Sequence, residues 1–368
     1  MIRLINYLKK EIILFGFLLL LVVLAGLYPS KIINYPSFVD WNTIIALTGL
    51  LIITTGLKES GYFNVLSGFL LKKFKTESSL SIYFILLSLL LSTFLTNDVS
   101  LFIVIPLTLS IHSIVKNDIS KLVILEVISV NVGSALTPIG NPQNIFLWHM
   151  WDIPFTTFII EMLPLLIVSL AILLIFAWII FPAREIKLSK RIINNTTPNK
   201  TLFVFSVMVL MVYVIFLEIK WTYLLLVIFI FYLLFYRTIL LKTDWLLLFL
   251  FVVIFIDFHI ISTITIISKS VSILNLHSAN NVFLFTALIS QLISNVPASV
   301  LVSKFSHNWF AITYGVNIGG NGLVIGSLAN IIALRLTKSK KIWLDFHKYS
   351  IPYFIISGIL TYVLFFMP

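Results

Sequence analysis

The sequence contains no cysteine, which excludes disulfides, thiol catalysis and metal sites with cysteine ligands. Charged residues are scarce: only 11% of the 368 residues are Asp, Glu, Lys or Arg, against about 25% in a typical soluble domain. Hydrophobic residues instead make up 60% of the chain, and the mean hydropathy is +1.10. A soluble fold has too little interior to bury this much apolar surface. These proportions exclude a soluble enzyme and predict an all-α polytopic membrane protein.

Motifs for enzyme chemistry are also missing. The sequence has no phosphate-binding loop of the type Gly-x-x-x-x-Gly-Lys-Ser/Thr, no His-Glu-x-x-His and no Gly-x-Ser-x-Gly. We therefore expect no enzymatic activity and no cofactor beyond a coupling ion. The formal net charge of +11 does not indicate nucleic-acid binding, because membrane proteins carry excess Lys and Arg in their cytoplasmic loops.

Long apolar stretches run through the whole chain, and a spanning helix needs roughly 20 such residues. Nine stretches predict spanning helices: 12–29, 41–57, 122–149, 158–181, 201–218, 221–239, 245–266, 310–334 and 350–367. Two further stretches, 80–113 and 281–305, are interrupted by polar residues at their midpoints. No small-residue cleavage site follows the first stretch, so residues 1–39 are predicted to retain an N-terminal span.

The basic residues predict the orientation of the chain in a cell membrane. They cluster at 3–10, 72–75, 184–200 and 335–341. All four clusters are cytoplasmic only if 80–113 enters and leaves from inside, and 281–305 from outside, as re-entrant hairpins. The N-terminus is then cytoplasmic and the C-terminus outside. The alternative, in which each interrupted stretch crosses once, moves the central basic loop outside.

Two segments resemble each other, at residues 130–145 and 316–331, and seven of the sixteen positions are identical. Each segment follows an interrupted stretch with an Asn at its break, and Asp-Trp opens a span upstream of both. This order predicts two repeats of inverted topology, an arrangement of many secondary transporters. The predicted units are an N-terminal span at 1–39, repeat 1 at 40–181, a basic linker with two connecting helices at 182–243, and repeat 2 at 244–368. In each repeat a hairpin precedes a broken helix, at 122–149 and 310–334.

The breaks predict an ion-binding site at mid-membrane depth. Asn residues that begin half-helices are good N-caps, helix N-termini suit anions, and carbonyls before a break suit a cation such as Na⁺. The alternative is that Gly and Pro kink these helices for packing only. Candidate substrate- and ion-binding residues are Thr96, Asn97, Asp98, Asn131, Gly133, Thr137, Gly140, Asn141, Asn144, Ser294, Asn295, Asn317, Gly319, Asn321, Gly326, Ser327 and Asn330. Na⁺ is expected at the two hairpin tips, Asn97 and Asn295.

Ionisable residues inside apolar stretches are functional candidates. Asp98, at the first hairpin tip, is the coupling candidate; alternatively, it only stabilises the start of a half-helix. Asp257 and His259 have no counterpart in the other repeat, and they either line a cavity or form a buried pair. Glu126 is interpreted as interfacial, as are His112 and Lys121.

Four ordered motifs resemble those of the ion transporter superfamily, which includes arsenite permeases, NhaD-type Na⁺/H⁺ antiporters, citrate transporters and sodium-coupled dicarboxylate symporters. The motifs begin at Leu95, Asn131, Ser294 and Tyr314, and the likeness is closest to prokaryotic anion permeases with a citrate-transporter-like domain. The resemblance implies a transport domain with two hairpins that moves as an elevator. In the dicarboxylate branch, Ser-Asn-Thr at both tips binds carboxylate and Na⁺. Here both tips keep the Asn, and neither keeps the final Thr.

The sequence as a whole predicts a secondary active transporter of a small anion, coupled to Na⁺ or H⁺ and working by elevator-like alternating access. Two alternatives stay open: a Na⁺/H⁺ antiporter, and an arsenite-type efflux permease driven by a partner ATPase. The expected partners are the lipid bilayer and the anion, without nucleic acid, and a homodimer is left open.

Overall fold

The computed structural model of this chain describes residues 12–62, 74–112, 120–185, 198–218, 223–264, 274–337 and 341–367. These ranges are mostly helical and contain no β-strand, only one isolated bridge between Thr76 and Glu185. Six helices within them are long and apolar enough to cross a membrane. They are α4 (Trp41–Glu59), α6 (Glu77–Phe94), α10 (Phe155–Ile180), α11 (Lys200–Glu218), α14 (Trp245–Ser262) and α20 (Lys341–Phe365). The prediction of an all-α polytopic membrane protein is therefore confirmed.

The first described segment is bent. Helix α2 (Ile12–Leu27) is followed by the short 3-10 helix η1 (Pro29–Asn34) and by α3 (Tyr35–Phe38). The chain direction bends by 117° between residues 14–27 and residues 29–38. Each of the two short helices has a proline in its first turn, where the missing N–H is tolerated and the fixed φ helps a helix to restart. The pair counts as a seventh candidate span only when both halves are taken together.

Each of the four predicted interruptions separates two helices. Leu95 and Thr96 lie between α6 and α7 (Asn97–His112), and Ser294 lies between α16 (Ala279–Ile293) and α17 (Asn295–Val302). Residues 135–141 separate α8 (Ser120–Ser134) from α9 (Pro142–Trp151). Residues 320–327, which include η2 (Val324–Gly326), separate α18 (Trp309–Gly319) from α19 (Leu328–Leu336).

The helix count differs from the nine predicted spans. The stretches 122–149 and 310–334, which were counted among these spans as broken helices, each contain two short helices. The stretch 221–239 is shorter than predicted, because α12 (Leu224–Phe235) ends at Tyr236 before α13 (Arg237–Lys242) begins. Helix α6 is longer than expected: it is long enough to span a membrane by itself, whereas the sequence predicts it as one arm of a re-entrant hairpin.

Contacts between helix ends define two faces of the molecule. At the Asp40 face, Lys31 donates a hydrogen bond to Thr263, just after α14, and Lys304, just after α17, lies within electrostatic range of Asp40. Asp40 is the N-cap of α4, and its carboxylate accepts the Asn42 backbone N–H at 3.2 Å. Helix α4 therefore begins where α14 ends.

At the Glu59 face, Lys242 forms an ion pair with Glu59, the last residue of α4. Asp244 caps α14 just beyond Lys242 by accepting the Leu247 N–H at 3.0 Å. The N–H of Asn199, before α11, donates to Ser60 O at 2.8 Å. Helices α4 and α14 therefore run in opposite directions, although both begin with an Asp cap followed by Trp.

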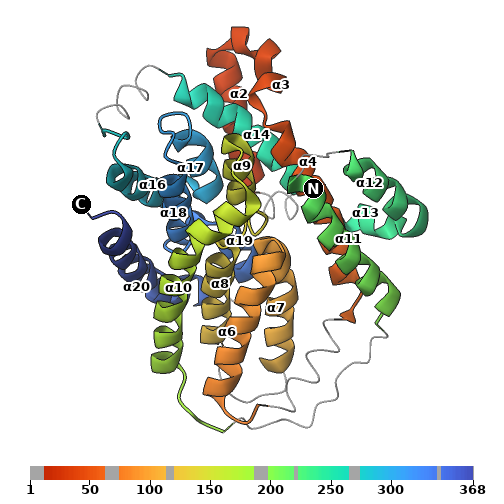
Figure 1. Ribbon diagram of the computed structural model, residues 1–368, viewed down its shortest axis with the longest axis vertical. Coiled ribbons are helices and arrows are strands. Elements are labelled where there is room, and N and C mark those ends of the chain that lie inside the picture. The colour runs from red at the N-terminus through yellow and green to blue at the C-terminus, as the bar shows by residue number, and fades with distance from the viewer. Residues whose placement is uncertain are drawn as a thin grey trace.

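Helices α6 and α7 lie in the lower part of the molecule and α16 and α17 in the upper left part, where α9 lies beside α17 (Figure 1). The base of α6 lies beside the end of α10, since the Glu77 N–H donates to Arg184 O at 2.9 Å. The start of α10 lies near α18, where Phe158 stacks on Trp309 with ring centroids 5.9 Å apart. Because 26 residues of α-helix extend for about 39 Å, α10 connects the two ends of the molecule.

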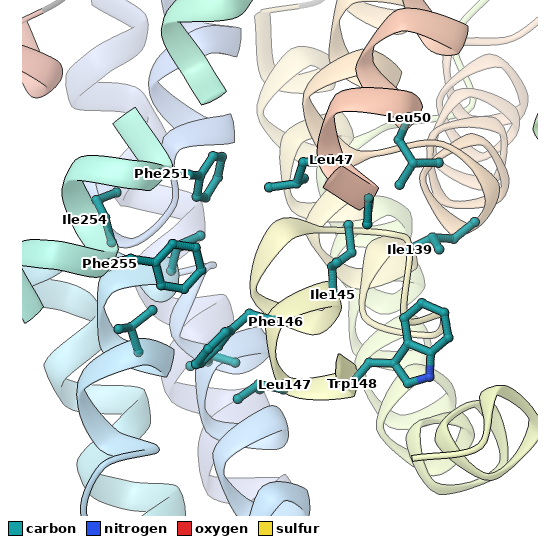
Figure 2. Close-up of a cluster of buried hydrophobic side chains, with 14 of the residues drawn as sticks. Leu47, Leu50, Ile139, Ile145, Phe146, Leu147, Trp148, Phe251, Ile254 and Phe255 are labelled. Atoms are coloured by element: carbon teal, nitrogen blue, oxygen red, sulfur yellow. The ribbon is translucent and has the colours of Figure 1, made fainter. Parts of the chain in front are cut away.

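The half-helix α9 is packed between the two antiparallel helices α4 and α14. Figure 2 shows Ile145 to Trp148 of α9 between Leu47 and Leu50 of α4 on one side and Phe251, Ile254 and Phe255 of α14 on the other. The rings of Phe146 and Phe255 are 5.4 Å apart between centroids, and all these side chains are buried. This apolar packing holds the start of α9, and the polar break before it, inside the protein.

Candidate ion-binding site

The tip of the first hairpin is held against the break between α8 and α9. The backbone N–H of Asn97 donates to Gly140 O at 2.8 Å, and Thr137 Oγ1 donates to Thr93 O at 2.7 Å. The Asn97 side chain accepts the Asp98 N–H at 2.9 Å. Asn97 and Asp98 are only 4% and 5% exposed, so this polar turn lies in the protein interior.

The tip of the second hairpin lies against the break between α18 and α19. Gln291 bridges to it: its amide nitrogen donates to Gly319 O, and its oxygen accepts the Leu323 N–H at 2.6 Å. Asn295 faces the same break, because a Cβ on Gly320 would lie 3.2 Å from Asn295 Nδ2. Ser294 forms the tip with φ 75° and ψ 156°, a conformation that non-glycine residues rarely adopt.

Four buried asparagines join the two broken helices to each other. Asn131 Nδ2 donates to Asn330 Oδ1 at 2.9 Å, and Asn317 Nδ2 donates to Asn144 Oδ1 at 2.9 Å. Asn131 and Asn317 occupy equivalent positions in the two similar segments, and so do Asn144 and Asn330. Each bond therefore joins the first Asn of one segment to the last Asn of the other. We call these four residues the amide network.

A second pair of equivalent residues adds to the amide network. Asn141 Nδ2 donates to Asn317 Oδ1 at 2.9 Å, and Ser327 Oγ, at the equivalent position, lies 3.5 Å from Asn131 Oδ1. Both breaks thus present the same kind of polar side chain to the opposite helix.

Several carbonyls at the breaks accept hydrogen bonds from side chains of the protein. Asn144 Nδ2 donates to Ser134 O at 3.2 Å and to Thr137 O at 3.1 Å. At the equivalent break, Asn330 Nδ2 donates to Gly320 O at 2.9 Å. The physical reason is that buried carbonyls need donors, and the side chain that follows each break supplies them.

Close packing explains the predicted glycines. A Cβ on Gly133 would lie 2.2 Å from Leu89 O in α6, and one on Gly319 would lie 2.9 Å from Ala287 O in α16. A Cβ on Gly140 would lie 2.2 Å from Ser134 O, and one on Gly326 would lie 2.6 Å from Gly319 O. These glycines allow the hairpins and the breaks to approach closely.

All the predicted site residues are buried and lie at or beside the four breaks. Within this region, Thr96 Oγ1 and Asn321 Oδ1 have no hydrogen-bond partner in the protein. Buried polar atoms are normally paired, so these oxygens are candidate ligand contacts. Gln143, in the first turn of α9, adds a third such oxygen. Gln143 is not among the site residues predicted from the sequence, although it lies between Pro142 and Asn144 in the motif.

Asp98 is the one ionisable side chain at either hairpin tip. No described residue donates a hydrogen bond to its carboxylate, and the Asp244 carboxylate is within electrostatic range of it.

Gln291 and Thr93 are further contact residues at the hairpins, and neither is among the residues predicted from the sequence. Each lies four residues before the tip Asn of its hairpin, and each bonds the carbonyl of a packing glycine, Gly319 or Gly133.

Two other interpretations of acidic residues need correction. Glu126 is fully buried and accepts a hydrogen bond from Thr108, so it is not interfacial; α7 covers it because α7 packs against α8. Asp257 and His259 do not form a pair, because neither carboxylate oxygen of Asp257 has a hydrogen-bond partner, and the His259 ring stacks on Phe38 with centroids 4.0 Å apart. The side chain of His112 lies outside the described residues, and the side chain of Lys121 is exposed on the protein.

Comparisons with known proteins give one family match and several relatives. The family model described as citrate transporter matches residues 8–309. The inner membrane protein YbiR of Escherichia coli is 38% identical over 357 residues, which covers 95% of this chain and 94% of YbiR. The uncharacterized transporter MJ0456 of Methanocaldococcus jannaschii is 36% identical over 325 residues, covering 87% of this chain and 86% of that protein. The chain is therefore a multi-pass membrane protein that belongs to the citrate transporter family, within the superfamily that its motifs resemble.

Proposed function

We propose that this protein is a secondary active transporter that carries a small carboxylate or inorganic oxyanion together with Na⁺ or H⁺. The observation that carries the proposal is the amide network, which joins the breaks of both broken helices beside the two hairpin tips. Each break removes backbone hydrogen bonds in the interior, which costs stability. A bundle of helices that only had to pack would not need four half-helices to end at one buried polar region.

The proposal includes an inverted repeat. Its support is that equivalent residues make equivalent bonds across the two segments, as expected for two units related by a two-fold axis. The opposite directions of α4 and α14 support it as well. In such transporters the substrate binds near the midplane, between the repeats.

The chemistry around the breaks suits an anion with a cation beside it. The N-terminal turns of α7, α9, α17 and α19 meet in this region, and each carries partial positive charge. The unpartnered oxygens of Thr96 and Asn321 are hard ligands suited to Na⁺. Alternating access by an elevator-like movement of the hairpins and broken helices belongs to this proposal on the strength of the family resemblance.

A ligand screen of the purified protein tests the proposal. Citrate is the first anion to try, given the family, followed by succinate, sulfate and arsenite, each with and without Na⁺. We expect one anion to raise the melting temperature, because saturation at 100 times Kd stabilises a protein by about 2.7 kcal/mol. If Na⁺ is the coupling ion, the shift grows when Na⁺ is present. A screen in which no anion gives a shift would argue against an anion site.

A Na⁺/H⁺ antiporter is the second candidate. It is favoured by Asp98, a buried carboxylate at the first hairpin tip that lies within electrostatic range of the Asp244 carboxylate. An ionised carboxylate at the tip attracts a cation and would repel an anion bound beside it.

The substitution Asp98→Asn separates the two candidates in proteoliposomes with imposed Na⁺ and pH gradients. For an anion symporter, we expect the variant to bind the anion with an altered dependence on Na⁺ or pH. For an antiporter, exchange stops, because the only titrating group at either tip is gone. Asp152→Asn is the matched control, since Asp152 is exposed and lies in the left-handed region, which Asn tolerates. Proton movement driven by Na⁺ alone in the wild type, and lost in Asp98→Asn, would favour the antiporter.

A further inference from the structure

A buried carboxylate lies outside the amide network. Asp257, in the second half of α14, has no exposed surface, and neither of its carboxylate oxygens has a hydrogen-bond partner. Helix α14 packs against α2, α3, α4 and the hairpin arm α17. Figure 1 shows α14 in the upper part of the molecule, near α2 and α17.

The groups that face Asp257 from these elements do not neutralise it. The Tyr35 hydroxyl of α3 is within electrostatic range and, like the carboxylate, is buried without a hydrogen-bond partner. Among the described residues of α2 and α17 there is no titratable side chain.

The remaining charges near this end of α14 lie at the Asp40 face. Lys31 is bonded to Thr263, and Lys304 lies near Asp40. His259 is the one other titratable group of α14, and it is stacked on Phe38. No ion pair joins any of them to Asp257, and α4 carries its own charged residues, Lys58 and Glu59, at the opposite face.

An ionised carboxylate in such surroundings is costly, and a buried group without a counter-charge becomes neutral instead. In the packed arrangement, Asp257 therefore carries a proton. The carboxyl group can release that proton to water only when α14 separates from a neighbouring element.

The neighbouring element that fits this role is the second hairpin. Phe258, the next residue along α14, lines a cavity of about 520 Å³ together with Leu301 of α17 and Ser294 at the hairpin tip. Because α14 and α17 are packed against each other, a movement of the hairpin would also change the packing of the part of α14 that carries Asp257.

We propose that Asp257 is a proton-binding site, and that it takes up and releases the proton that couples to transport. The proton adds to a carboxylate oxygen when the second hairpin packs against α14, and it leaves to water when that contact opens. The coupling half of this proposal rests on the proposed transport function, whereas proton binding at Asp257 does not.

Infrared pH-difference spectra of the purified full chain test proton binding without any substrate. We expect the wild type to show a carbonyl band of a protonated carboxyl group that is absent from Asp257→Asn and kept in the control Asp152→Asn. Asp98 and Glu126 are present in all three proteins, so the difference isolates Asp257. An unchanged band in Asp257→Asn would mean that this carboxylate is ionised, and would overturn the proposal.

Transport of labelled citrate in proteoliposomes tests the coupling. We expect a pH gradient to drive uptake by the wild type, and Asp257→Asn to lose about tenfold or more of this uptake. Exchange of internal for external citrate needs no net proton movement and should persist in the variant. Uptake by Asp257→Asn that still follows the pH gradient would overturn the coupling role. A wild type that binds and moves no anion would contradict the proposed function and leave the infrared result standing.

Discussion

Ser294 is a strained residue at a predicted functional position. Its φ of 75° with ψ of 156° belongs to a region that is essentially reserved for glycine, and such strain costs about 1–3 kcal/mol. Thr96, which directly precedes the tip Asn of the first hairpin as Ser294 precedes that of the second, does not have a positive φ. Glycine would adopt this conformation without strain, so a serine at this position indicates that the hydroxyl group is needed at the tip.

We therefore expect Ser294→Gly to raise the melting temperature, because glycine adopts this conformation without strain. Ser294→Ala is the matched control, since it also removes the hydroxyl but keeps the Cβ and the strain. Both variants should lose transport if the hydroxyl contacts the ligand, while only the glycine variant gains stability. A glycine variant that melts below the alanine variant would refute this account of the tip.

At the scale of the element, the two hairpins approach the broken helices through glycine. Helix α6 meets α8 at Gly133, and α16 meets α18 at Gly319, so the same residue type stands at equivalent positions of the two segments. These contacts bring Thr93 and Gln291 close enough to bond the glycine carbonyls. The close helix packing therefore positions both tips.

Gly133→Ala should destabilise the protein by about 1–3 kcal/mol, as overpacking in a well-packed interior does. The new methyl group meets the backbone carbonyl of Leu89, which cannot rotate away. Gly319→Ala should be destabilising as well but somewhat less so, because its nearest contacts, Ser290 Cβ at 2.6 Å and Ala287 O at 2.9 Å, are longer than the 2.2 Å to Leu89 O at Gly133. Gly16→Ala is the control, since nothing lies within 4 Å of the added atom. Thermal unfolding in detergent checks this order, and a destabilised Gly16→Ala would show that the alanine effect is not specific to packing.

At the scale of the whole molecule, the bases of the two hairpins lie at opposite ends. Glu77 is bonded beside the end of α10, whereas Lys304 lies near Asp40. The basic loops predict that the first base is cytoplasmic and the second is outside.

Single cysteines test this topology cleanly, because the chain has none of its own. Lys75→Cys, at the base of the first hairpin, should react with an impermeant maleimide from the same side as Lys200→Cys. His307→Cys, after the second hairpin, should react from the other side, as should Asp152→Cys. All four positions are exposed, so failure to label would not reflect burial. Labelling of positions 75 and 307 from one side would contradict the inverted arrangement.

Local signals were enough to locate the breaks. Polar residues within an otherwise apolar stretch mark such breaks, so Asn97, Asn141 and Ser294 could be recognised from the sequence. The capping role predicted for the Asn residues is seen at Asn141, whereas Asn97 and Asn295 are the first residues of their helices. Composition likewise determined that lipid is the solvent for most of the chain, because no soluble interior is large enough. The constant spacing of Asn131 from Asn317, and of Asn144 from Asn330, indicated the repeat.

The tertiary structure alone decided which groups meet. The bonds of the amide network join residues 173 and 199 positions apart, and their pairing depends on how two broken helices cross. The same is true of Glu126, which neighbours cover, and of Asp257, which they leave without a partner. A sequence pattern shows that a side chain is polar and in an apolar helix. Whether that side chain is bonded, exposed or unsatisfied depends on the other helices packed around it, and those come from distant parts of the chain.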